Sequence, residues 1–181
     1  MFNPDVILEG QRVRLRFLRI EDTEAIFNNI NHDKEVLTYF IDKYLEKVED
    51  LNLERRIKYC LENQRYIFAI ELKATNEVIG MILQCSTPDR MFTGSEIGYA
   101  IGQKYWNKGY TSEAFGLLID FLFKCGVHKI VASHLVGNDA SKRVMEKNGL
   151  VYEGRRIDEV YYHDRYYDVD YYYLINPAQK N

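Results

Sequence analysis

The strongest constraint on the fold is an apolar stripe that recurs at helical spacing after a short polar loop. The spacing i, i+3, i+4, i+7 and i+8 predicts an amphipathic helix with one buried face. Its members are Ala114, Leu117, Leu118, Phe121 and Leu122. Gly126 then favours a helix end, because glycine readily adopts the left-handed conformation that closes helices. The buried face needs a second layer, and an alternating strand pattern at 95–101 is suited to form it.

The rest of the chain predicts a mixed sheet with helices packed against it. Alternation or apolar runs predict further strands at 13–17, 65–72, 78–84, 129–135, 151–157 and 166–175, the last two around a turn near His163 and Asp164. Helices are predicted from Asp22 through Ile30, at 48–63 and at 138–147. This order is not a regular βαβ array, and it favours an α/β domain of the α+β type. Because repeats and linkers are absent, we expect residues 1–181 to form a single domain.

Composition narrows the classes of function. The net charge of −3, from 24 basic and 27 acidic residues, disfavours a broad basic face for direct nucleic-acid binding. Three widely spaced cysteines suit a reducing compartment, and four histidines show no metal-ligand spacing. No apolar run approaches the roughly 18 residues that a membrane span requires. The sequence therefore predicts a cytoplasmic protein with no membrane, metal or nucleic-acid partner.

The loop that precedes the amphipathic helix, at 102–109, has the composition of an anion site. The first turn of a helix leaves N–H groups unpaired at its positive end, and a diphosphate can use both features. Gly109 permits close approach to the backbone, and Lys104 and Lys108 add positive charge. Thr111 adds a hydroxyl donor. A plain capped loop with two solvated lysines explains the same residues equally well, and the P-loop and dinucleotide-binding glycine patterns are absent.

A second segment, at 138–150, combines with this loop and with the strand at 94–101 to give a family resemblance. The three segments, NDASKRVMEKNGL, QKYWNKGYTSE and GSEIGYAI, stand in an order and spacing that resemble the GCN5-related N-acetyltransferases. Within that family the chain is most similar to the ribosomal-protein-alanine-acetyltransferase-like branch. The resemblance covers nearly the whole chain, including the early LEGQRVRLRFLRIEDTEAIF and the late YEGRRIDEVYYHDRYYDVDYYYL.

The resemblance implies a centrally splayed sheet and acetyl-CoA as the acyl-donor substrate, without a metal. The segment at 103–111 matches the one that holds the coenzyme A diphosphate through backbone amides. Asn138 matches a contact to the pantetheine arm, which would lie in the wedge between the strands at 95–101 and 129–135. The implied cofactor-binding residues are Ile101, Gln103, Lys104, Asn107, Lys108, Gly109, Tyr110, Thr111, Asn138 and Ser141. In one departure, the loop reads Asn107-Lys108-Gly109 where the family often has glycine or arginine first.

Two residues are candidates for catalysis. Glu96 lies on a strand that would line the acceptor cleft, and a carboxylate there can take a proton from an acceptor ammonium, directly or through water. A surface glutamate is the alternative reading. Ser141 matches a position near the sulfur and would protonate or hydrogen-bond the leaving thiolate. In a second departure, Met145 stands where many family members carry a tyrosine acid, which strengthens the case for Ser141.

Together these features predict acetyl-CoA-dependent acetyl transfer to a primary amine, by direct transfer in a ternary complex. The acceptor is a protein N-terminus or a small molecule, and the acceptor loops at 31–46 and 86–93 carry no substrate signature. A non-catalytic acyl-CoA-binding sensor or regulatory module, or a transferase for a longer acyl group, remain alternatives. Cys85 is an alternative nucleophile without a paired base. The eight tyrosines between 152 and 173 suit cross-strand pairing, an acceptor wall or the face of a homodimer.

Overall fold

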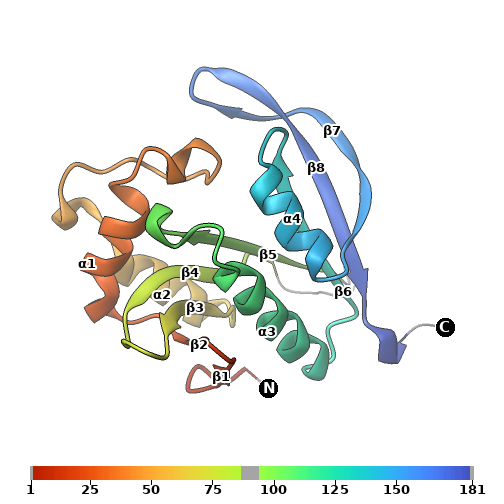
Figure 1. Ribbon diagram of the computed structural model, residues 1–181, viewed down its shortest axis with the longest axis horizontal. Helices are drawn as coiled ribbons and strands as arrows, with labels where there is room; N and C mark the ends of the chain where they lie inside the picture. Colours follow the sequence, from red (N-terminus) through yellow and green to blue (C-terminus); the bar gives the residue numbers. More distant parts are fainter. Residues whose placement is uncertain (1, 87–93, 180–181) are drawn as a thin grey trace.

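The computed structural model describes residues 2–86 and 94–179, and within them one eight-stranded sheet crosses the molecule in the order β1-β2-β3-β4-β5-β6-β8-β7 (Figure 1). The strands are β1 Ile7–Glu9, β2 Val13–Phe17, β3 Ile67–Leu72, β4 Val78–Gln84, β5 Gly94–Ile101, β6 Lys129–Leu135, β7 Val151–Tyr162 and β8 Arg165–Ile175. The α-helices are α1 Thr23–Ile26, α2 Leu53–Glu62, α3 Tyr110–Lys124 and α4 Asp139–Lys147. Neighbouring strands are antiparallel except β5 and β6, which are parallel. The predicted α/β class with a mixed sheet is confirmed.

Helices cover both faces of the sheet. Successive strand residues point to opposite sides, so a strand with apolar residues at every position needs a packing partner on each face. On β3, Phe68 and Ile70 belong to the core beneath α3 and α4, where Leu118 of the predicted stripe is fully buried. Ile67 and Ala69 of the same strand belong to the core beneath α1 and α2. None of the helices formed by the described residues is both long and apolar enough to cross a membrane.

The sheet opens at its centre. β5 and β6 pair only at Gly94–Lys129, Ser95–Ile130 and Glu96–Val131. Beyond Glu96, β5 stays paired to β4 as far as Ile101, while β6 stays paired to β8 as far as Leu135. The two strands therefore diverge, and the central splay expected from the family resemblance is confirmed.

Several element boundaries differ from the sequence prediction. The helix predicted to run from Asp22 through Ile30 is a short α1 followed by a π-helical turn, Phe27–Asn31. The helix predicted from residue 48 begins at Leu53, because the side chain of Asn52 accepts a hydrogen bond from the Arg55 amide and caps the helix there. The short strand β1 was not predicted at all, since three residues are too few for a periodic signal.

The terminal hairpin is longer than predicted. β7 continues to Tyr162, and irregularities in its register near Gly154 and between Arg156 and Val160 interrupt the alternation on which the prediction depended. The turn at His163 and Asp164 is as predicted, with positive φ at both residues. The tyrosines pair across the strands, as Tyr161–Tyr166 at 5.0 Å and Tyr152–Tyr172 at 5.5 Å between ring centroids. The predicted cross-strand pairing is therefore confirmed for these four tyrosines.

Candidate active site

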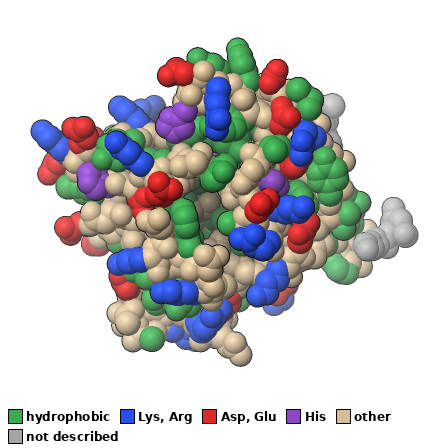
Figure 2. Space-filling model, turned by 45° about the horizontal axis from the view of Figure 1, so that its top comes forward, with side chains coloured by type: hydrophobic (Ala, Val, Ile, Leu, Met, Phe, Trp, Pro, Cys, Tyr) green, Lys and Arg blue, Asp and Glu red, His purple; other side chains and the backbone are tan. Residues whose placement is uncertain are grey.

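A cavity of about 1010 Å³ lies where β5 and β6 diverge. Figure 2 shows a hollow between the two halves of the molecule, with acidic and basic side chains around its mouth. Its walls come from β5, β6, the start of α3, the start of α4, residues of the segment at 35–41 and the terminal hairpin. Seven of the residues predicted from sequence line it: Glu96, Ile101, Asn107, Gly109, Thr111, Asn138 and Ser141.

One end of the cavity is the N-terminus of α3. Gly109 precedes the helix with φ of 79°, and no side chain caps the helix at this position. The first N–H groups of the helix therefore have no intrahelical partner, and they lie at the positive end of a 15-residue helix. A side chain at Gly109 would be strained by this φ and would come within 3.3 Å of the Arg12 guanidinium. This end of the cavity suits a phosphate group.

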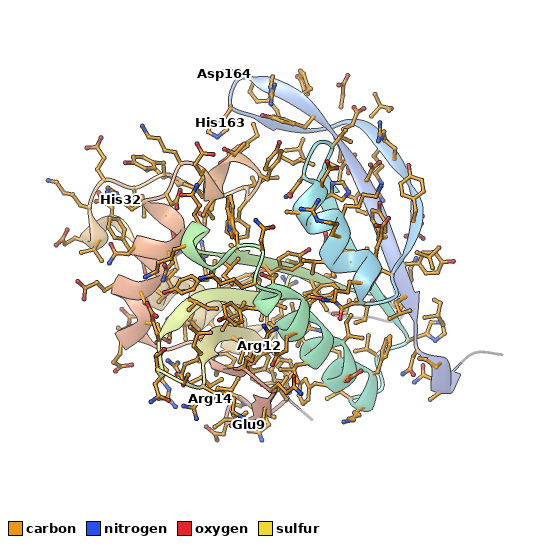
Figure 3. The ribbon with its side chains drawn as sticks, viewed as in Figure 1. Glu9, Arg12, Arg14, His32, His163 and Asp164 are labelled. Atoms are coloured by element: carbon orange, nitrogen blue, oxygen red, sulfur yellow. The ribbon has the colours of Figure 1, made fainter. Side chains whose placement is uncertain are left out.

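An ion pair between Arg12, which immediately precedes β2, and Glu113 of α3 holds this turn in place. The Arg12 amide donates to Glu113 Oε1 at 2.8 Å, and Arg12 Nε donates to Oε2 at 3.0 Å. Arg12 Nη1 also donates to the Lys108 carbonyl at 2.8 Å, beside the start of α3 (Figure 3). Burial opposes ionisation of Glu113, but hydrogen bonds from the Arg12 and Val13 amides and from the Arg12 side chain outweigh it and lower its pKa. No local pattern in the sequence indicates this pair.

The two predicted loop lysines, Lys104 and Lys108, do not line the cavity. Lys104 forms an ion pair with Glu77 at 3.1 Å, and the Lys108 ammonium lies 5.8 Å from the centre of the Tyr105 ring. The side chains of Gln103 and Tyr110 are likewise outside the cavity lining. Among the described residues, the cationic side chains of Arg and Lys that line the cavity are Arg143 and Lys147. Their i, i+4 spacing on the helix that carries Ser141 was the signal that could have found them.

Ser141 lies in the first turn of α4 and is 9% exposed. Asn138 caps this helix, since its Oδ1 accepts from the Ser141 amide at 3.1 Å. The Ser141 hydroxyl lies 2.7 Å from the hydroxyl of Tyr99, a β5 residue that the sequence analysis missed. Met145, at the position of the absent tyrosine acid, is fully buried and packs in the core. The hydroxyl groups of Ser141 and Tyr99 therefore lie side by side at this point of the cavity.

Glu96 stands where the pairing of β5 and β6 stops, and it lines the same cavity. Ser133 of β6 donates to Glu96 Oε1 at 3.3 Å, so the carboxylate is held from the opposite strand. Burial, together with the charge of Glu96, raises the pKa of Cys85 to about 12. Its thiol remains protonated at neutral pH, which argues against Cys85 as the nucleophile.

The far end of the cavity is formed by segments distant in sequence. Val160, Val169 and Tyr171 of the hairpin face residues of the segment at 35–41. The hairpin tip, labelled by His163 and Asp164, lies close to this segment (Figure 3). Of the two predicted acceptor loops, the one at 31–46 is described, whereas residues 87–93 of the other lie outside the described part of the chain. Among the described residues, no group of three or more His, Cys, Asp or Glu side chains is placed to hold a metal ion.

Comparison with known proteins identifies the family. A model described as "Acetyltransferase (GNAT) domain" matches residues 12–151. The chain is 30% identical over 176 residues to the uncharacterized N-acetyltransferase YoaA of Bacillus subtilis, covering 96% of this chain and 98% of that one. It is 24% identical over 173 residues to the spermidine N(1)-acetyltransferase of Vibrio cholerae, covering 95% and 98% of the two chains.

Solved structures share the fold. A GNAT acetyltransferase from Bacillus anthracis superposes with a TM-score of 0.82 at 26% identity, covering 94% of this chain and 99% of that one. The ribosomal-protein-S5-alanine acetyltransferase of Vibrio fischeri gives 0.83 at 21% identity, covering 98% and 100%. The spermidine N-acetyltransferase of Vibrio cholerae, in complex with CoA and spermine, gives 0.79 at 22% identity, covering 92% and 97%. The chain belongs to the GNAT family of N-acetyltransferases.

Proposed function

We propose that this protein transfers an acetyl group from acetyl-CoA to a primary amine, on a protein N-terminus or a small molecule, directly within a ternary complex. The observation that carries the proposal is the placement of Glu96 and Ser141 on one continuous cavity that also includes the start of α3. Relatives of this fold support both acceptor classes, since one is an acetyltransferase of spermidine and another of a ribosomal protein.

The cavity has features that fit coenzyme A. The free amides at the start of α3 suit the diphosphate, and Arg143 and Lys147 add positive charge to the same cavity. The stretch of β5 that faces the wedge is unpaired with β6, so its edge can form strand-like hydrogen bonds to the pantetheine amides. When bound, acetyl-CoA supplies an activated acetyl group with a thiolate as leaving group.

Glu96 accepts a proton from the acceptor, directly or through one water. An ammonium has no lone pair, so transfer requires the amine to lose a proton, and a carboxylate on the cavity wall is placed to accept it. Ser133 orients the carboxylate by its hydrogen bond. Backbone N–H groups in the unpaired part of β5 are available to polarise the reacting carbonyl, as in an oxyanion site. Ser141 donates a hydrogen bond or a proton to the departing sulfur from the other side.

The role of Glu96 predicts a dependence on the basicity of the acceptor. Glu96→Gln keeps the shape and removes the basic oxygen, so we expect CoA affinity to stay unchanged and kcat at pH 7 to fall about 10- to 100-fold. The loss should be larger for a lysine-like amine, with a pKa of about 10.4, than for a peptide N-terminus, with a pKa of about 8. Rising pH should restore part of the rate, because solvent then deprotonates the amine.

The measurement is a pH–rate profile of the wild type and Glu96→Gln against a panel of amines, with Glu153→Gln as control. Glu153 is a β7 carboxylate outside the cavity lining, paired with Lys129. Profiles of equal height for the wild type and Glu96→Gln would show that Glu96 is not the base. Binding of acetyl-CoA without transfer to any amine would contradict the proposed function as a whole. A preference for longer acyl-CoA donors would show that the transferred group is a longer acyl group and not acetyl.

A second prediction concerns Ser141. We expect Ser141→Ala to lower the single-turnover rate about 10- to 100-fold, on the scale of losing one positioned proton donor. Calorimetric titration should give the same CoA affinity, because Asn138 still caps the main-chain amide of residue 141. An unchanged single-turnover rate would remove Ser141 from the mechanism.

A further inference from the structure

The hydroxyl groups of Tyr99 and Ser141 form a pair that the family resemblance did not imply. Tyr99 lies on β5 within the splayed stretch, and Ser141 lies on α4, so the pair joins two walls of the cavity. The oxygen atoms are 2.7 Å apart, an ordinary hydrogen-bond distance between hydroxyl groups. The Tyr99 hydroxyl also has the geometry of a donor to the Ser141 carbonyl oxygen, at 3.2 Å.

The two contacts together limit how the protons can be arranged. A carbonyl oxygen only accepts, and the Ser141 carbonyl, in the first turn of α4, is also an acceptor within the helix. The serine oxygen is the nearer acceptor for the tyrosine proton. When Tyr99 donates to it, the serine O–H no longer has Tyr99 as its acceptor and is free to turn toward the cavity. In the reverse arrangement the tyrosine proton goes to the Ser141 carbonyl oxygen, and the serine O–H is directed at the phenol and away from the cavity.

We infer that Tyr99 is a positioning residue for Ser141: its phenol donates to Ser141 Oγ and directs the serine O–H at the departing sulfur. This inference rests on the proposed function, in which Ser141 assists departure of the thiolate. The acceptor nitrogen forms a bond to the acetyl carbon, the carbon–sulfur bond breaks, and its electron pair goes to the sulfur, which accepts a hydrogen bond from Ser141. The proton lost by the acceptor amine goes to Glu96, and the released thiolate takes its own proton from solvent.

Two properties of Tyr99 support this role. Burial raises its pKa to about 12, so the phenol keeps its proton across the pH range in which acetyl transfer is measured. Its ring packs edge-on against Phe115 of α3 at 5.3 Å, which fixes the direction of the hydroxyl. A hydrogen bond received by Ser141 also makes its own O–H a stronger donor, because hydrogen-bonded chains polarise one another.

The alternative is that Tyr99 only packs against α3 and α4. A double-mutant cycle of Tyr99→Phe and Ser141→Ala separates the two roles, with single-turnover rates as the readout. We expect Tyr99→Phe to lower the rate about 5- to 10-fold, the scale of one hydrogen bond, with unchanged CoA affinity and melting temperature. In the Ser141→Ala background the same change should alter the rate less than about twofold, because the group that Tyr99 positions is gone.

The control is Tyr66→Phe. Tyr66 is also buried, and its hydroxyl accepts a hydrogen bond from the Asn3 amide at 3.1 Å, but it lies outside the cavity lining. This variant should keep the wild-type rate. A second test retains the ring and its hydroxyl: a polyfluorinated tyrosine at position 99 has a more acidic phenol. Its rate should fall at a lower pH than that of the wild type, as ionisation removes the donor.

Each outcome decides between the roles. A wild-type rate for Tyr99→Phe, a loss that adds fully to that of Ser141→Ala, or an unaltered pH profile with the fluorinated residue overturns the inference and leaves the proposed function standing. A wild-type rate for Ser141→Ala overturns both the inference and the proposed role of Ser141. Loss in Tyr99→Phe that disappears in the Ser141→Ala background supports the inference.

Discussion

Two separate features favour a residue without a side chain at Gly109: its backbone conformation and the access of the proposed ligand to the α3 amides. Its φ of 79° lies in the left-handed region, where a side chain costs about 1–2 kcal/mol. The absence of a side chain also leaves the first amides of α3 accessible from the cavity, which Gly109 lines. Strain and blocked access would both follow from a substitution, so a test must separate them.

Gly149 offers the matched comparison. It also has positive φ, at 81°, but a Cβ there would meet nothing within 4 Å. We expect Gly109→Val to weaken CoA binding more than tenfold and Gly149→Val to leave it unchanged, although both lower the melting temperature through strain. Lys108→Ala should weaken binding only slightly, since that side chain lies outside the cavity lining. Calorimetric titration with CoA measures all three, and equal affinities for Gly109→Val and wild type would move the diphosphate site elsewhere.

At the scale of elements, helices and strands that depend on neighbouring residues could be predicted from the sequence, whereas contacts between distant segments could not. Helix α3 and the strand before it could be predicted because their apolar residues repeat periodically within about 30 residues of chain. The role of Gly109 could be predicted from the residue types in the loop at 102–109. Pairing between Arg12 and Glu113 joins residues 101 positions apart, and nothing in either local pattern indicates it. Tyr99 was missed for the same reason, because its significance depends on α4, whose Ser141 lies 42 positions later.

The Arg12–Glu113 pair predicts a pH dependence of stability. The pKa of Glu113 is lowered in the folded state, so its ionised form stabilises the fold. That contribution is present above the unfolded pKa, about 4.5, and is lost as pH falls through the lower folded value. We expect Glu113→Gln to lose about 1–2 kcal/mol at pH 7 and to show a smaller further loss at acid pH than wild type.

Denaturant unfolding between pH 3 and pH 7 measures this difference. The control is Glu146→Gln, because Glu146 is half exposed and 3.8 Å from Lys142 on the same helix, where an ion pair contributes little. Glu113→Gln should also weaken CoA binding, since the Arg12 that holds the Lys108 carbonyl loses its carboxylate partner. Coincident stability curves for wild type and Glu113→Gln would show that the pair does not stabilise the fold, and parallel but offset curves would show that the ionisation of Glu113 is not the cause.

At the scale of the whole molecule, the acceptor end of the cavity depends on a contact between its two halves. The Tyr162 hydroxyl, on β7, lies 3.0 Å from the carbonyl oxygens of both Leu37 and Asp42. These residues are more than 100 positions apart, and their contact holds the terminal hairpin against the segment at 31–46 (Figure 1). The possible homodimer and the single domain over residues 1–181 stay predictions.

Removing this contact should affect the acceptor and not the coenzyme. Tyr162→Phe leaves the Leu37 and Asp42 carbonyls without their donor, so the segment at 31–46 loses one attachment to the hairpin. We expect KM for the acceptor amine to rise about 5- to 10-fold, while CoA affinity stays unchanged, because the start of α3 lies at the other end of the cavity.

Tyr166→Phe is the control, since Tyr166 is 64% exposed on the same hairpin. Steady-state kinetics with one identified amine, together with calorimetric titration of CoA, measure both effects. An unchanged acceptor KM in Tyr162→Phe would show that the hairpin does not shape the acceptor site, and a matching loss of CoA affinity would show that its effect is not confined to that end.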